Sequence, residues 1–421
     1  MLIEIHMIQN HSPSNLNRDD LGAPKTCIFG GVTRARISSQ CLKRSIRRSL
    51  EFAAALEKDG GVRTRRMANL LARIAYAEDF DLTPEKLSKF LEEEPAVNEE
   101  IERLEGIAAE TLEIGGVKPK SKKKNKKSGD DEEATAEALS KMLLFLSAKT
   151  IAKMAKDLKS ESKAGDLAEK FKKYIAENPG VPDIALNGRM TEVAKKSVFS
   201  DLSFTVEAAL SAAHALSTHA VVNEVDYFTA ADDVPGQDAG AGHVNEAMFN
   251  SACFYKHFVI DWDQLLKNLN NDADLAATTV RCFLEAAAKA NPSGKQHAYA
   301  AFNSPDGILV EIKTESATPV SYANAFADPV PDKSERGLIG ESIARLGHYV
   351  HDLTEGYGIK AERFWFSPNL RQRLMWIDEY KKKPEQEQSV VGSDHEFKEF
   401  GGFVKAVMGK VPPATPAGAT T

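Results

Sequence analysis

The 421-residue chain is 42% hydrophobic and 27% charged, proportions of a globular protein that exclude a wholly disordered or collagen-like chain. Its formal net charge of −7, from 54 basic and 61 acidic residues, argues against a uniformly cationic surface of the kind that binds nucleic acid. Apolar runs are too short to span a membrane and the N-terminus lacks a signal-peptide pattern, so we expect a cytoplasmic protein that does not bind membranes.

The N-terminal region begins with a predicted strand at residues 2–9, LIEIHMIQ, which is rich in β-branched and apolar residues. A polar loop follows at residues 11–26, where prolines and a glycine interrupt any helix. The run IFGGVTRARIS predicts a hairpin, because its two adjacent glycines supply the positive φ of a tight turn. A helix then begins near Ser38 or Ser39, either of which can cap it, and is expected to continue to about residue 58.

Basic residues are concentrated in the hairpin and the first part of this helix. Residues 21–50 contain seven Lys or Arg and no acidic residue. At about 100° per residue, four basic side chains fall within an arc of roughly 140° on the helix. These four are Lys43, Arg44, Arg47 and Arg48, with Leu42 and Ile46 facing inward. By itself, the pattern is typical either of a solvated helix surface or of an anion-binding face.

Residues 57–182 are rich in helical patterns and poor in strand signals, which predicts an inserted helical domain. Within it, residues 118–127 carry seven lysines and are followed by a run of four acidic residues. Blocks of this kind do not fold, so we expect a disordered loop at 117–134. Its lysines are either only solvated or an auxiliary contact for nucleic acid.

Strand patterns return after residue 182 and alternate with helices. The order strand, helix, strand is followed by strand, helix and two strands, which is compatible with a ferredoxin-like or RRM-like α+β sheet. The segments are strands at 183–190, 221–233, 251–261, 296–303 and 307–313, and helices at 205–220, 273–290, 336–357 and 367–382. The last residues, 411–421, predict a disordered tail.

No motif for catalysis or metal binding is complete. The cysteines Cys27, Cys41, Cys253 and Cys282 form no C-x-x-C pair, so we expect reduced, mostly buried thiols. P-loop and zinc-protease patterns are each broken at a required position. We therefore predict no metal, no cofactor and no catalytic residue.

Residues 16–49, LNRDDLGAPKTCIFGGVTRARISSQCLKRSIRRS, resemble the N-terminal signature of the CasC-type backbone subunit of type I-E CRISPR Cascade, in the RAMP superfamily. Further segments resemble the same family in the same order: DIALNGRM, AAHALSTHAVVNEVDYFTAADD, GAGHVNEAMFNSACFY, GKQHAYAAFNSPDG and SYANAFADPV. Together they cover most of residues 1–330, and a colinear set of this length is far more specific than any short motif.

This resemblance implies an α+β fold with an RRM-like or ferredoxin-like palm, an inserted helical fingers domain and a β-hairpin thumb. The palm would come from three parts of the chain, and the thumb would lie between two of them. The implied boundaries are 1–56 for the first palm part, 57–182 for the fingers, 183–218 for the second palm part, 219–247 for the thumb, 248–410 for the third palm part with C-terminal helices, and 411–421 for the tail.

The resemblance also implies a set of RNA-binding residues. The palm would bind phosphates with Arg18, Lys25, Ser38, Gln40, Lys43, Arg44 and Arg47. Arginine and lysine neutralise phosphates without reading bases, and a helix N-terminus adds N–H donors.

In the thumb, Tyr227, Phe228 and Thr229 match a wedge that enters between nucleotides, and Met190 matches the residue that meets it. Tyr-Phe in a strand is otherwise more often part of a core. An aromatic wedge acts irrespective of base sequence.

The function implied is a non-catalytic subunit that coats CRISPR guide RNA as a filament of its own copies. Together with other Cascade subunits, it would present the guide for pairing with a target DNA strand, leaving sequence recognition to base pairing. Two rivals stay open. One is a metal-dependent endoribonuclease using Asp19 or Asp20, although aspartates in such a loop are far more often Asx-type anchors, or partners for Arg18 or for a neighbouring subunit. The other is a general single-strand binder outside any CRISPR complex.

Overall fold

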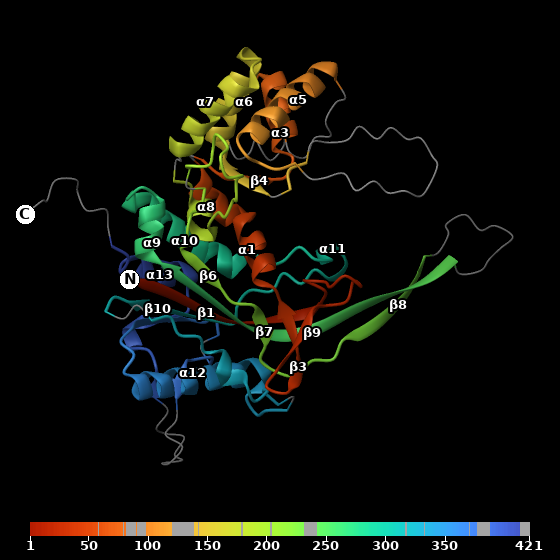
Figure 1. Ribbon diagram of the computed structural model, residues 1–421. Coiled ribbons are helices and arrows are strands. Elements are labelled where there is room, and N and C mark those ends of the chain that lie inside the picture. Colours follow the sequence, from red (N-terminus) through yellow and green to blue (C-terminus); the bar gives the residue numbers. More distant parts are fainter. Residues whose placement is uncertain are drawn as a thin grey trace, which may run out of the picture. The chain divides into compact units, whose positions relative to one another are not determined.

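The computed structural model describes residues 1–57, 59–78, 80, 90, 98–119, 139–141, 143–177, 180–202, 204–230, 242–315, 318–331, 333–369, 371–376 and 388–412 (Figure 1). The chain forms two compact units. The first unit comprises Met1–Phe52, Leu210–Asp263 and Ala277–Thr421, and the second comprises Ala53–Ala209 and Gln264–Ala276. Most of the predicted disordered loop at 117–134 and of the predicted tail at 411–421 lies outside the described residues.

A large sheet forms the centre of the first unit. Among the described residues its strands follow the order β14–β11–β10–β1–β9–β7–β3–β2, with β6 and β8 also paired to β9. The strands are β1 Leu2–Ser14, β2 Thr26–Phe29, β3 Val32–Ile37, β6 Leu210–Ala212, β7 Ala215–Ser217, β8 Glu224–Ala230, β9 Gly242–Asp261, β10 Gly307–Lys313, β11 Glu362–Phe366 and β14 Glu396–Phe397. The predicted mixture of helices and sheet is confirmed.

Helices cover both faces of this sheet (Figure 1). On one face, α12 (Gly337–Tyr357) packs Leu346 and Val350 into a core with Leu309 and Trp365 of the sheet. We call this the α12 face. On the other face, α10 (Ala273–Lys289) places Phe283 against Phe258 with ring centroids 5.5 Å apart, and α13 (Phe400–Met408) packs against β11. We call this the α10 face, and α1 (Ser39–Arg47) lies on the same side.

The register of the central strands decides which residues share a face. In antiparallel pairs, directly opposite residues point the same way. His6 of β1 lies opposite His257 of β9, and Glu4 lies opposite Glu311 of β10. These four side chains therefore belong to the α12 face, whereas the intervening Met7 and its partner Lys256 belong to the α10 face.

The second unit is mainly helical and has its own core. Its elements are η1 Ala54–Leu56, α3 Met67–Ala77, α5 Glu99–Ile114, α6 Ala148–Ser160, α7 Ala164–Glu177, α8 Pro182–Asn187 and the paired strands β4 Gly61–Thr64 and β5 Leu144–Ser147. Leu71, Ile151 and Phe171 are fully buried between the helices. The described residues of 57–182 are mainly helical, and the β4–β5 pair was not predicted. The remaining elements are α2 Leu50–Ala53, α9 Trp262–Asn268, α11 Gln296–Tyr299, η2 Ala323–Phe326, β12 Met375–Trp376, β13 Gln388–Ser389 and η4 Ser393–His395.

The helix predicted from residue 38 to about 58 is wrong in its length. Ser38 caps it as expected, but α1 ends at Arg47. The Ser49 hydroxyl accepts a hydrogen bond from the Phe52 N–H at 3.2 Å and so begins the separate α2. A serine that caps a new turn competes with the continuing helix for backbone donors.

Four further predicted elements are wrong. The alanine-rich stretch 205–220 forms β6 and β7 rather than a helix, because Ala212 and Leu216 pair with β9. Pairing in the tertiary structure overrides the helix preference of alanine. Conversely, 183–190 contains most of helix α8, and 296–303 contains the short helix α11 instead of a strand. The described part of 367–382 forms turns and β12 rather than a helix.

No helix in the described part of the chain is both long and apolar enough to cross a membrane. The longest of them, α12, has 21 residues, but polar and charged side chains alternate with its apolar ones. The compartment in which the protein acts stays a prediction.

Candidate nucleic-acid interface

The loop before β2 is held in one conformation by an aspartate. Oδ1 of Asp19 accepts hydrogen bonds from the N–H groups of Leu21 and Ala23, both at 2.9 Å. Arg18 forms an isolated bridge with Pro24 across the base of the loop. Because the backbone is fixed on both sides of it, the exposed Arg18 side chain projects from an ordered position. Asp19 thus serves as a loop anchor of the Asx type.

The start of α1 is joined to the same loop. The Ser38 side chain caps the helix by accepting from the Cys41 N–H at 3.3 Å, and the Ser38 N–H donates to the Asn17 side chain at 2.9 Å. Leu42 and Ile46 are buried, as the helical pattern predicted. The first turn of α1 contains no acidic residue. No carboxylate of that turn therefore neutralises the partial positive charge of the free N–H groups at the N-terminus of α1.

Between this loop and α1 lies a cleft of about 520 Å³, which we call the α1 cleft. Its wall includes Arg18, Asp19, Asp20, Arg44, Ser293 and Gly294. Gly294 approaches the loop so closely that a Cβ atom would lie 2.4 Å from the Leu16 carbonyl oxygen. Any larger residue would push the two walls apart, so the cleft depends on glycine at this position.

Of the seven palm residues that the resemblance implies, two line the α1 cleft: Arg18 and Arg44. The other five do not line it. Lys25 directly precedes β2, Ser38 caps α1, and Gln40, Lys43 and Arg47 lie on α1. The Lys43 ammonium group donates to the Leu210 carbonyl at 3.0 Å, and burial lowers the pKa of Lys43. Since an ammonium group has three donors, this bond leaves capacity for a phosphate. Ser293 and Gly294, which also line the cleft, were not predicted as site residues. The signal that could have found them is the segment beginning at Gly294, GKQHAYAAFNSPDG, which resembles the family.

The hairpin of β8 and β9 presents two aromatic side chains to solvent. Tyr227 pairs with Glu246 and Phe228 with Asn245, and 69% of Tyr227 and 48% of Phe228 are exposed. Successive strand residues point to opposite faces, so the two rings lie on either side of a two-stranded ribbon. The backbone of Thr229 continues the pairing. These rings are not part of a core.

Met190 belongs to the second unit, where 79% of its side chain is exposed. It follows Arg189, whose backbone pairs with Val206 and whose guanidinium donates to the carbonyls of Phe204 and Phe145. Arg189 therefore fixes the chain just before Met190. Single exposed apolar side chains are common on protein surfaces, so only the family resemblance makes Met190 a candidate contact for a ligand.

Residues 3–390 match the family model Cas_CT1975, described as CT1975-like protein. The chain belongs to the Cas_CT1975 family. Two solved structures share its fold. A chain of a "CRISPR RNA-guided surveillance complex, pre-nicking" is 26% identical, with a TM-score of 0.71 and coverage of 97% of this chain and 99% of that one. A chain of a "CRISPR RNA-guided surveillance complex" is 22% identical, with a TM-score of 0.54 and the same coverage, and shows the fold alone. A comparison with curated proteins finds no match.

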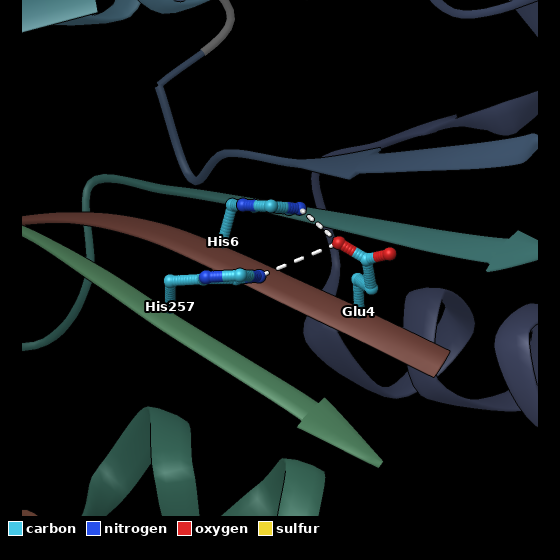
Figure 2. Close-up of side chains that lie close together, drawn as sticks. All are labelled: Glu4, His6 and His257. Carbon is cyan, nitrogen blue, oxygen red and sulfur yellow. Dashed lines mark ion pairs between the residues drawn. The ribbon is translucent and has the colours of Figure 1, made fainter. Parts of the chain in front are cut away.

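Within the described residues of this Cas_CT1975 protein, one group of side chains has the composition of a metal site (Figure 2). Nε2 of His257 lies 3.4 Å and Nε2 of His6 lies 3.8 Å from the carboxylate of Glu4. All three side chains are buried on the α12 face, and neither Nε2 has a hydrogen-bond partner. Two imidazoles and a carboxylate are ligands that zinc accepts.

Basic side chains of the protein already pair with the carboxylates in and beside this group. The Lys313 ammonium donates to Glu4 at 2.7 Å, and the Arg363 guanidinium donates to Glu311 at 2.7 Å. The Tyr322 hydroxyl donates to the same Glu311 carboxylate at 2.9 Å. Two buried negative charges are thus matched by two positive ones. Such pairing is what allows charges to remain in a low-dielectric interior.

The pKa values follow from this arrangement. Burial and the neighbouring His257 lower the pKa of His6 to about 4, so this imidazole is neutral near pH 7. Burial would raise the pKa of Glu311, but His6, Arg363 and Lys313 outweigh it and lower that pKa to about 2. The pKa of Glu4 is also lowered, because His257, His6 and Lys313 outweigh its burial.

The imidazole rings argue against a metal in this arrangement. Their centroids are 4.5 Å apart and their planes differ by 6°, so the rings are stacked and their in-plane lone pairs run parallel instead of converging. A tetrahedral site needs ligands aimed at one point. We interpret the group as a closed ion-pair network that stabilises the sheet. Alternation along β1 places Glu4 and His6 on one face, but their partners on β9, β10 and β11 are distant in sequence.

Proposed function

We propose that this Cas_CT1975 protein is a Cascade backbone subunit of the CasC type, in a type I-E complex. Several copies bind along one CRISPR guide RNA and, with other subunits, present it for pairing with a target DNA strand. Family membership and the fold shared with chains of CRISPR RNA-guided surveillance complexes support this proposal. The protein acts as a scaffold and catalyses no reaction.

The observation that carries the proposal is the α1 cleft. An exposed arginine from an ordered loop and another from α1, Arg18 and Arg44, line the same concave surface. It adjoins the N-terminus of α1, where backbone N–H groups favour an anion. Arginine side chains and helix N-termini bind phosphates without contacting base edges. A guide whose sequence varies requires binding of this kind.

The topology supports an RRM-like palm. With other elements between them in the chain, β1, α1, β6, β9, α10 and β10 occur in the order βαββαβ, and their strands lie in the order β10–β1–β9–β6 with antiparallel pairing throughout. This is the ferredoxin-like arrangement. We assign the palm to the first unit, the fingers to the second unit and the thumb to the β8–β9 hairpin.

Exposed aromatic rings support the role of the hairpin as a wedge. Tyr227 and Phe228 present π-faces on both sides of a ribbon, so that the hairpin can separate two nucleotides and stack on both. Stacking tolerates any base, which suits a variable guide. Thr229 and Met190 are proposed as further RNA-binding residues on the resemblance alone.

A salt titration tests the proposal. Anisotropy of labelled single-stranded CRISPR RNA should show tight binding whose log–log salt slope decreases by roughly 0.7 in Arg44→Ala, since each lost phosphate contact releases fewer counterions. Lys360→Ala is the matched control, because Lys360 is an exposed cation paired with Glu315. Mass photometry should show multiples of the chain on longer RNA. Absence of binding would overturn the proposal. Equal affinity for unrelated DNA and RNA without multimers would favour a general single-strand binder.

The endoribonuclease rival has one observation in its favour. Asp20 is exposed and lines the α1 cleft beside Arg18 and Arg44, where a carboxylate could hold a metal against a phosphate. Asp19 is the weaker candidate because its Oδ1 already accepts two N–H bonds. Following RNA integrity in magnesium and in EDTA separates the two functions. Magnesium-dependent cleavage that is lost in Asp20→Asn would make the protein an enzyme.

A further inference from the structure

A second cleft of about 640 Å³ continues from the α1 cleft on the α10 face of the first unit. The two share Arg44, Ser45 and Ser293, so a ligand can pass from one to the other along α1. Phe302 forms part of the wall of the second cleft and is 68% exposed. We call this second space the Phe302 cleft.

A series of hydrogen bonds through buried polar side chains attaches the loop that carries Phe302 to the sheet. The Lys256 ammonium, 1% exposed, donates to the side-chain oxygen of Gln9. The amide nitrogen of Gln9 then donates to the Asn303 carbonyl at 2.6 Å and to the Asn291 side chain at 3.1 Å. These bonds attach both ends of residues 291–303 to the sheet. Phe302 lies next to one of the attachment points, so its backbone position is fixed.

The same loop contains backbone conformations that side chains normally avoid. Lys295 and Ala300 have φ values of 47° and 48°, in the left-handed region. The buried Gln296 side chain donates to the carbonyls of Pro292 and Ala301 at 3.0 and 3.2 Å and maintains this shape. Strained non-glycine residues persist where the surrounding structure imposes them, and they cluster at functional sites. Here the imposed shape holds a phenylalanine in solvent rather than in the core.

The charges around Phe302 indicate what binds there. The wall of the cleft contains three cations, Arg44, Arg48 and Lys289, and one acidic residue, Glu51, which gives a net charge of +2. A flat aromatic ring surrounded by cations matches the bases and phosphates of a single nucleic-acid strand. A protein segment docking by apolar contact alone would not require this excess of positive charge.

We propose that the Phe302 cleft is a base-stacking subsite, in which Phe302 stacks on one nucleobase of the RNA strand whose phosphates lie in the α1 cleft. This inference rests on the proposed function and deepens it, because it names the part of the nucleotide that each cleft binds. Arg44, shared by both clefts, binds the phosphate between the two subsites. Each copy of the protein then contacts its stretch of RNA through phosphates in one cleft and through a base in the other.

Affinity measured at several salt concentrations distinguishes stacking from charge. Stacking releases no counterions, so Phe302→Ala should weaken binding of CRISPR RNA about tenfold at every salt concentration and leave the salt slope unchanged. Phe302→Tyr should retain the affinity because it keeps the ring. Tyr357→Ala is the matched control, since Tyr357 is 80% exposed in the same unit at the end of α12. Unchanged affinity in Phe302→Ala would overturn the inference.

Photocrosslinking of the wild-type chain provides an independent readout. CRISPR RNA carrying 5-iodouridine at successive positions is irradiated in the complex, and crosslinked peptides are identified by mass spectrometry. We expect crosslinks at Phe302 at regular intervals along the RNA. If RNA binds but no crosslink reaches the peptide containing Phe302, the subsite is wrong while the proposed function stands. If Phe302→Ala abolishes multimers but not RNA crosslinking, the cleft binds a second copy of the chain instead. Failure of the wild-type chain to bind RNA would overturn the proposed function itself.

Discussion

The two faces of the central sheet bury polar groups in opposite ways. On the α12 face, the buried charges of Glu4 and Glu311 are matched by the buried Lys313 and the mostly buried Arg363. On the α10 face, Lys256 is buried against the neutral amide of Gln9, while Arg44 and other cations remain at solvent-exposed clefts. Charges paired within a fold are costly to leave without their partners, whereas charges left open can bind a ligand. We therefore expect variants on the two faces to separate folding from RNA binding.

The largest effect should come from breaking the network on the α12 face. Lys313→Met removes the partner of Glu4 and leaves a buried carboxylate uncompensated, which should lower the free energy of unfolding by roughly 3–5 kcal/mol. Urea denaturation followed by circular dichroism measures this loss. Lys360→Met, which removes an exposed ion pair with Glu315, should cost less than about 1 kcal/mol.

A result in which both lysine variants lose the same small free energy would contradict the comparison, because it would mean that the buried network is not energetically special. The double variant Glu4→Gln with Lys313→Met sharpens the test. Removing both charges should recover much of the stability, since the cost of the single change is mainly that of an unpaired charge.

A somewhat smaller effect should follow from acid. The pKa of His6 is about 4 in the folded chain, below the ordinary value of 6.5, so the unfolded chain binds this proton more tightly. The stability contributed by neutral His6 is therefore complete above about pH 6.5 and is lost as the pH falls toward 4. Between pH 6.5 and 5, where carboxylates titrate little, we expect a loss of roughly 2 kcal/mol.

His6→Gln should remove this part of the pH dependence, while His297→Gln, at an exposed position, should not. The α10 face has its own acid-sensitive group, because burial and Lys256 lower the pKa of His11 to about 3. His11→Gln should remove a comparable part of the pH dependence of the free energy of unfolding in the same pH range. If urea midpoints of His6→Gln and the wild-type chain change in parallel from pH 6.5 to 5, the role assigned to His6 is wrong.

The contrast between the faces also explains what could be predicted from the sequence. The strand at residues 2–9, the hairpin before α1 and the Ser38 cap depend on neighbours along the chain, and all three were predicted. The α1 cleft needs the loop around Gly294 to approach Leu16, a contact between distant segments. The ion-pair network likewise joins Glu4 and Lys313, which are 309 residues apart along the chain. Local patterns contain no signal for such contacts.

Errors arose where local preference and long-range pairing disagree. Alanines around residue 212 favour a helix, yet Ala212 pairs with Phe258 because β9 offers an open edge there. The resemblance to a known family supplied what local patterns could not, because it singled out Arg18 and Arg44, which the fold brings together in one cleft. It gave no indication that Lys43 also supports the fold, and although one of its segments contains Phe302, it assigned no role to that ring.

Lys43 and Arg44 allow the finest test of the comparison, because they are adjacent on α1 but differ in surroundings. Lys43 is half-buried and bonded to the Leu210 carbonyl of β6, whereas Arg44 is exposed in both clefts. Lys43→Ala should lower the free energy of unfolding by about 1 kcal/mol, and Arg44→Ala should change it by less than about 0.5 kcal/mol. In RNA binding the order should reverse, with Arg44→Ala reducing the salt slope more than Lys43→Ala.

The variant Lys43→Met separates the two contributions of Lys43, since it keeps the apolar stem that packs on the fold and removes the charge. It should retain part of the stability that Lys43→Ala loses, with the remaining loss due to the bond to Leu210. A full decrease of roughly 0.7 in salt slope for Lys43→Met, without any loss of stability, would place Lys43 among the open charges of the α10 face. The bond to the Leu210 carbonyl would then be exchanged for a phosphate when RNA binds, and the boundary between structural and ligand-binding cations would lie one residue earlier on α1.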